Sequence, residues 1–162
     1  MSENKITIWE EMTILWAIVF IYSWIIFFIF VDKDRLNKTI YGGIIAVALG
    51  SLVDWAGHKM GLYLFDTQPW LLVSILYAGG PLLTAGVLFF QYISPNRKLQ
   101  AANILAFTLS YLAVETLLVS SGGASYLHWN YLASLGVDLI VFTAFSYIGE
   151  YIVLEKRGHT LR

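Results

Sequence analysis

Five long apolar stretches follow one another along this 162-residue chain, and they constrain its fold more than any other feature. Hydrophobic residues make up 58% of the sequence and charged residues only 13%. A helix of roughly 20 apolar residues crosses a hydrocarbon core about 30 Å thick. Backbone groups inside a bilayer must hydrogen-bond within their own segment, so each stretch is predicted to be a helix. The sequence therefore predicts an all-α integral membrane bundle.

We expect one transmembrane domain over residues 1–162, with five transmembrane helices at about 12–31, 39–57, 70–93, 100–121 and 131–154. The loops between the stretches are short, so neighbouring helices should pack antiparallel. The third stretch contains Gly79, Gly80 and Pro81, which predict a kink. The hydroxyl of Thr84 is a candidate donor to a carbonyl left free there. Interrupted spans also mark binding sites in some transporters, but a plain kink is the simpler interpretation.

The positive charges predict the orientation. Eight of the ten Lys and Arg residues lie in the segments 31–38 and 94–99 and in the C-terminal tail, and only Lys5 and Lys59 lie on the other side. Because cytoplasmic segments carry the excess of Lys and Arg, we expect the N-terminus outside and the C-terminus in the cytoplasm. The expected location is the cell membrane, as a multi-pass protein.

Composition and motifs exclude several classes of function. A net charge of −1 argues against a nucleic-acid partner, and the absence of Cys removes thiolate nucleophiles and thiolate metal ligands. Neither a phosphate-binding G-x-x-x-x-G-K-[ST] motif nor a dinucleotide-binding motif is present. The lipid bilayer is the one certain partner. Because five spans are few for a secondary transporter with paired repeats, a homo-oligomer or a larger membrane partner stays open.

Three acidic residues lie inside the predicted helices with no Lys or Arg at a similar depth: Asp54, Glu115 and Asp138. From the 1.5 Å rise per residue, Asp54 lies roughly 5 Å below the outer boundary and the other two roughly 10 Å below it. An unpaired carboxylate in a membrane is costly, so it is a functional candidate by default. The sequence predicts an outward-facing acidic pocket that binds ligand through Asp54, Glu115, Asp138 and His128, with His58 also at its mouth.

A purely structural role is the alternative. Tyr111 precedes Glu115 by four residues, and Ser134 precedes Asp138 by four, so both hydroxyls are within reach along a helix face. Polar bonds of this kind often hold membrane helices together.

One helix face raises the question of a metal cofactor. Every fourth residue from 42 to 58 forms one row, namely Gly42, Ala46, Gly50, Asp54 and His58. The small residues would let another helix approach closely. Asp54 and His58, one turn apart, would grip a divalent metal ion if Glu115, His128 or Asp138 supplied further ligands.

The last stretch carries a second polar row, which ends in Glu150 near the cytoplasm, where Lys156 and Arg157 are potential partners. A proton path along this row is disfavoured because Phe142 interrupts it.

Three functions stay open. The leading hypothesis is a pocket that binds a cation, a proton or a small polar or cationic ligand, in transport or sensing. The first alternative is an intramembrane enzyme acting on a lipid or isoprenoid head group, with a carboxylate as general base and metal assistance as an option. The second is an accessory subunit whose small-residue row docks a larger protein. Whether the chain is an enzyme is left undecided.

The stretch from Gly50 to Glu150 resembles a family of small, uncharacterised multi-span membrane proteins of endospore-forming bacteria. The resemblance rests on Asp54 followed by Gly61-Leu62-Tyr63, on Pro81, Glu115 and Asp138, and on the run Tyr126-Leu127-His128-Trp129-Asn130. It implies a membrane protein and no particular activity.

Overall fold

The computed structural model describes the backbone of residues 3–64 and 70–154, and the side chains of residues 13–64 and 72–154. Four long helices are α1 (Glu3–Phe30), α2 (Leu36–Lys59), α5 (Arg97–Ser120) and α6 (Tyr131–Gly149), and the remaining span joins α3 (Trp70–Tyr77), the π-helical turn η2 (Ala78–Leu82) and α4 (Leu83–Gln91). The short elements are the 3₁₀ turn η1 (Lys33–Arg35), the π-helical turn η3 (Glu150–Leu154) and the strands β1 (Tyr63–Leu64) and β2 (Ser125–Tyr126). Among the described residues, five helices are long and apolar enough to cross a membrane, as expected for an all-α, multi-pass membrane protein.

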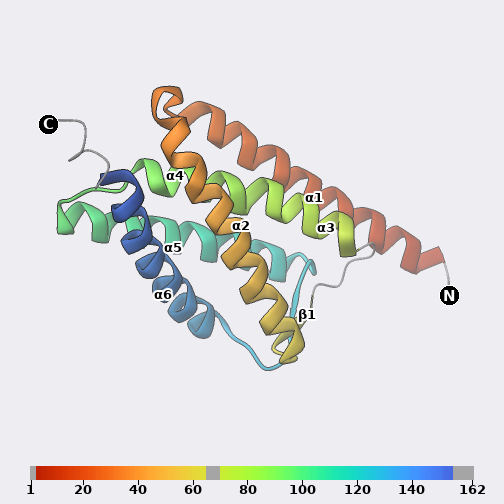
Figure 1. The fold of residues 1–162 in the computed structure, drawn as a ribbon. Coiled ribbons are helices and arrows are strands. Elements are labelled where there is room, and N and C mark those ends of the chain that lie inside the picture. The colour runs from red at the N-terminus through yellow and green to blue at the C-terminus, as the bar shows by residue number, and fades with distance from the viewer. Residues whose placement is uncertain (1–2, 65–69, 155–162) are drawn as a thin grey trace, which may run out of the picture.

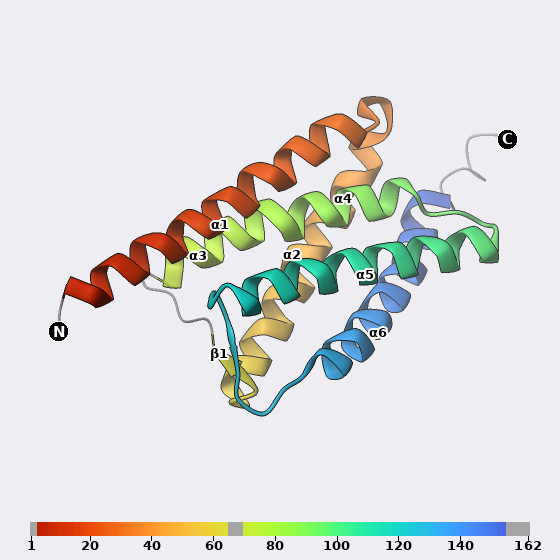
Figure 2. The same cartoon turned by 180° about the vertical axis from the view of Figure 1, so that it is seen from behind.

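The helices form two crossed layers. Helix α1, the α3–η2–α4 span and α5 lie in one layer, and α2 and α6 lie across them in the other (Figures 1 and 2). Helix α2 packs mainly against α4 and η2, whereas α6 packs mainly against α5. The second layer is therefore two helices, each held by a different member of the first.

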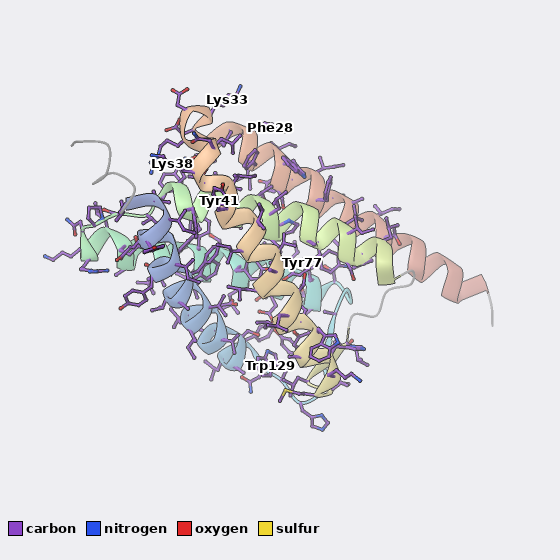
Figure 3. All side chains as sticks on the ribbon, viewed as in Figure 1. Phe28, Lys33, Lys38, Tyr41, Tyr77 and Trp129 are labelled. Atoms are coloured by element: carbon purple, nitrogen blue, oxygen red, sulfur yellow. The ribbon has the colours of Figure 1, made fainter. Side chains whose placement is uncertain are left out.

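The two ends of the bundle differ in character. At the end that we call the sheet end, the segments Met60–Leu64 and Ser121–Asn130 meet in a two-stranded antiparallel pairing of β1 with β2. At the opposite end, which we call the basic end, lie η1 and the start of α5, with Arg97 and Lys98. Figure 3 shows Lys33 and Lys38 at the basic end, far from Trp129 at the sheet end.

Small residues bring α2 and α4 into backbone contact. A Cβ atom built on Gly86 would lie 2.5 Å from Cβ of Ala46, and one built on Gly43 would lie 2.8 Å from the carbonyl oxygen of Leu83. Such distances leave no room for a side chain, so the small residues set this approach. The small residues of the row, Gly42, Ala46 and Gly50, therefore pack within their own chain, on α4 and η2.

The break in the third span is a π-helical turn, and neighbouring side chains donate hydrogen bonds to its carbonyl oxygens. Pro81 lies inside η2, where it can donate no backbone hydrogen bond. The Thr84 hydroxyl donates to the carbonyl oxygen of Gly80 at 2.8 Å, so Thr84 is the donor that the sequence suggested. The indole of Trp24 donates to the carbonyl oxygen of Gly79 at 3.1 Å, a contact from α1 that the sequence did not predict.

Aromatic side chains fill the bundle toward the basic end. Phe89 and Phe145 stack with ring centroids 5.3 Å apart, and Phe90 and Phe142 complete the cluster. Nearby, Glu150 forms an ion pair with Arg97 at 2.5 Å. The partners expected from the sequence, Lys156 and Arg157, lie outside the described residues.

Candidate functional site

A pocket of about 410 Å³ lies in the sheet-end half of the bundle, between the two helix layers. Its walls come from α2, α5, α6 and the α3–η2–α4 span, with Trp16 of α1 and the paired segments around β1 and β2 completing it. Asp54, Glu115 and Asp138 come from three different helices and all line this pocket. The three acids that the sequence singled out therefore share one site.

Asp54 is held by tyrosines. The Tyr63 hydroxyl donates a hydrogen bond to Oδ1 of Asp54 at 3.1 Å. The hydroxyl of Tyr77 is a second neighbour of the same carboxylate. The chain reverses after α2 through Gly61, whose φ of +66° is a conformation that glycine adopts freely. This reversal brings Tyr63 back over the last turns of α2, and thus onto Asp54.

Glu115 accepts two hydrogen bonds on one oxygen. The hydroxyls of Tyr126 and Ser134 donate to Oε1 at 2.8 Å and 2.6 Å. Ser134 in turn accepts a hydrogen bond from the indole of Trp129 at 2.7 Å. The donors expected from helix spacing are therefore wrong: Ser134 bonds Glu115 rather than Asp138, and Tyr111 bonds the hydroxyl of Tyr77.

Asp138 differs from the other two acids. Its Oδ2 is buried and has no hydrogen-bond partner among the residues that the structure describes. A buried acceptor without a donor loses its hydration and gains nothing in return. Asp138 therefore has a buried oxygen that no donor of the described residues occupies.

The paired loops at the sheet end position two of the hydroxyl donors. Tyr63 and Tyr126 are register partners in the β1–β2 pairing. The backbone N–H groups of Leu127 and His128 both donate to the carbonyl oxygen of Leu62, which extends the pairing. Burial raises the pKa of both tyrosines, and the nearby Asp54 carboxylate raises that of Tyr63 further. Both phenols therefore stay protonated and keep their role as donors.

The two histidines do not line the pocket. His58 and His128 are both exposed, and Nδ1 of His128 lies 3.2 Å from the carbonyl oxygen of Gly61. Within residues 3–64 and 70–154, no group of three or more His, Asp or Glu side chains is arranged to hold a metal ion. The metal suggested for Asp54 and His58 thus finds no additional ligands in the part of the chain described.

The rest of the lining is apolar or aromatic. No Lys or Arg of the described segments lines the pocket. Toward the basic end the walls are aliphatic and aromatic, with Leu82, Phe142 and Phe145 among them. Trp16, Tyr77 and Tyr111 lie deeper than the loop tyrosines, and Trp16 meets Tyr77 edge-on at 5.7 Å. The site therefore combines carboxylates and aromatic rings, and no described residue brings a positive charge into it.

Sequence reasoning missed most of the side chains around the acids. Tyr63, Tyr77, Tyr126 and Trp129 are aromatic residues near span ends, where Tyr and Trp are common for interfacial reasons. One signal was present, because Tyr63 and Tyr126 each follow a glycine-containing reversal after an acid-bearing helix. That pattern marks loops that fold back over their own helices.

Comparisons with protein-family models, curated proteins and solved structures find no match for this chain. The resemblance noted from the sequence therefore stays an expectation. Several of the residues that carry it line the pocket, namely Asp54, Tyr63, Pro81, Glu115, Tyr126, Trp129 and Asp138.

Proposed function

We propose that this protein is a cell-membrane protein whose outward-facing pocket binds a small ligand through a cationic group. The observation that carries the proposal is the convergence of Asp54, Glu115 and Asp138 on one pocket that no Lys or Arg of the described segments enters. A cation bound among these acids would supply the positive partner that none of the described residues provides. The outward orientation follows from the Lys and Arg distribution, since the pocket lies at the end opposite the basic one.

Asp138 is the expected primary contact. Asp54 and Glu115 already accept hydrogen bonds from protein hydroxyls, whereas Oδ2 of Asp138 has no donor among the described residues. A ligand ammonium would satisfy that oxygen, and the surrounding rings would add cation–π attraction.

Sensing or capture is better supported than transport. Phe89, Phe90, Phe142 and Phe145 fill the bundle between the pocket and the basic end. Passage of a ligand to the cytoplasm would require these rings to separate, whereas binding from the outer side requires no such change.

Titration calorimetry with tetramethylammonium tests the proposal on protein in mild detergent. Asp138→Asn should weaken binding at least about tenfold, because truncating one partner of a buried charge pair typically costs more than the 1.4 kcal/mol that tenfold represents. Glu150→Gln is the matched control, since it removes an acid from the same helical span but outside the pocket. Unchanged affinity in Asp138→Asn and in Asp54→Asn/Glu115→Gln/Asp138→Asn would refute the proposal.

An intramembrane enzyme acting on a lipid head group is the second candidate. The unpartnered oxygen of Asp138 favours it, because a general base needs a lone pair that no protein donor occupies. Product formation from a labelled lipid, lost in Asp138→Asn but kept in Glu150→Gln, would support catalysis. Ligand binding without product formation would refute the enzyme and support the ligand-binding function.

A further inference from the structure

The pocket lies between α2 and α6, two helices that pack little against each other. Helix α2 packs on α4 and η2, and α6 packs on α5, but α2 reaches the α6 span appreciably only through η3 at the basic end. Figure 1 shows α2 and α6 on the near side, with α5 and the α3–α4 span behind them. Toward the sheet end, α2 and α6 therefore do not close their layer by packing against each other.

The pocket-lining valines of α2 and α6 that are partly exposed, which we call the mouth, lie within candidate membrane spans. Val53 on α2 lines the pocket and is also 38% exposed. Val137 and Val141 line it from α6 and are partly exposed. Val53 lies inside the candidate span Lys33–Lys59, and Val137 and Val141 lie inside the candidate span Tyr131–Leu154. A side opening bordered by these valines would face lipid tails rather than water.

The lining changes from polar to apolar along the pocket. The carboxylates and the phenols of Tyr63 and Tyr126 lie toward the sheet end, whereas Ala46, Leu82 and Phe145 lie toward the basic end. Ala46 and Asp54 are eight residues apart on α2, which corresponds to about 12 Å along the helix. A ligand that filled the whole pocket would need a polar head and an apolar chain.

From these observations we infer that the pocket takes a single-chain amphiphile with a cationic amine head from the surrounding lipid leaflet, sideways between α2 and α6. The inference rests on the proposed cation-binding function and adds the class of ligand and its route. The head would lie among the three acids and the chain against Leu82 and Phe145. A phosphate-bearing head group is disfavoured, because its anion would face carboxylates with no Lys or Arg of the described segments beside it.

Photo-crosslinking in nanodiscs of neutral phospholipid tests the ligand class. The probe is decylamine with a diazirine at the chain end, and adducts are located by mass spectrometry. We expect adducts on Leu82, Phe142 or Phe145, and competition by alkyltrimethylammonium salts that strengthens roughly fourfold per methylene until the pocket is filled. Decyl sulfate and decanol are the matched competitors without a positive charge, and they should compete weakly.

The outcomes separate this inference from the function on which it rests. If tetramethylammonium competes as well as the decyl compound, the cation-binding function stands and the amphiphile is wrong. If adducts form equally on the lipid-facing Ile140, the chain is not in the pocket and the inference is again overturned. If no ammonium compound competes and tetramethylammonium gives no heat in calorimetry, the cation-binding function itself fails.

A substitution at the mouth tests the route. Val137→Trp should slow labelling by the decylamine probe several-fold, because the larger ring narrows the opening. Ile140→Trp is the control, since Ile140 is 71% exposed on the same helix and does not line the pocket. Val53→Trp repeats the test from α2 in case Val137→Trp does not fold. Equal labelling rates in the mouth variants and in Ile140→Trp would overturn sideways access.

Discussion

Tyr63 and Tyr126 are register partners across the β1–β2 pairing, and each donates its hydroxyl to a carboxylate on a different helix. Tyr63 bonds Asp54 of α2, and Tyr126 bonds Glu115 of α5. Side chains directly opposite in an antiparallel pair point to the same face, so both rings are directed toward the helices below. The short strand pairing thereby connects the acid-bearing ends of α2 and α5.

Tyr126→Phe should destabilise the protein by about 1.5–3 kcal/mol, the usual contribution of a hydrogen bond to a charged acceptor. A double-mutant cycle with Glu115→Gln, followed by SDS titration in mixed micelles, measures the coupling between the two side chains. Tyr147→Phe is the control, because Tyr147 is 63% exposed and does not line the pocket. Additive effects of the two pocket substitutions would contradict the bond.

Alkaline pH should weaken the fold through Tyr63. Its pKa is raised in the folded protein, so above about pH 10 the unfolded chain loses this proton first and the free energy of unfolding falls. Tyr63→Phe should make that fall shallower by up to about 1.4 kcal/mol per pH unit, reduced by solvent screening at this partly buried ring. The slope is measured by SDS titration between neutral and strongly alkaline pH. An identical slope in both proteins would show that Tyr63 titrates normally.

Gly42→Ala should cost about 1–3 kcal/mol, the usual range for overfilling a tight contact. A Cβ atom at Gly42 would overlap the backbone of Gly86 and the ring of Phe90. Gly136→Ala is the matched control, since nothing lies within 4 Å of a Cβ built there. Alanine favours helix over glycine, so the control should be neutral or slightly stabilising. Thermal unfolding of the two variants gives the comparison, and equal melting temperatures would contradict close α2–α4 contact.

Thr84→Val should destabilise the protein by about 1 kcal/mol, because it leaves the carbonyl oxygen of Gly80 without the hydroxyl that bonds it inside a buried π-helical turn. Thr116→Val serves as the control, since Thr116 bonds the preceding turn of its own helix at an exposed position. Chemical unfolding of both variants should show the larger loss for Thr84→Val. The reverse order would mean that the turn does not depend on this hydroxyl.

The class of fold and the three acids could be predicted because each depends on local properties of the sequence. The length of an apolar stretch predicts a membrane helix. A carboxylate inside such a stretch can be recognised without knowing where the other helices lie. A break at Pro81 and its donor Thr84 could be predicted for the same reason, since both belong to one segment, although the sequence predicted a kink and the structure has a π-helical turn.

The partners of the acids could not be predicted, because they depend on how helices rotate and how loops fold back. Ser134 lies one turn before Asp138, yet its hydroxyl points across the interface to Glu115 on α5. Helix rotation in a bundle is set by contacts with neighbours and not by the limits of a span. The pairing of β1 with β2 joins segments about 60 residues apart, and no local pattern announces it.

The aromatic cluster of Phe89, Phe90, Phe142 and Phe145 lies between the pocket and the basic end, and Phe142 and Phe145 line the pocket itself. A ligand in the pocket would have to leave without passing this cluster. Under the proposed function, occupancy would therefore report ligand on one side of the membrane only, and filling or emptying the pocket would open no leak for ions. A cell could carry many copies of such a protein without discharging its membrane potential.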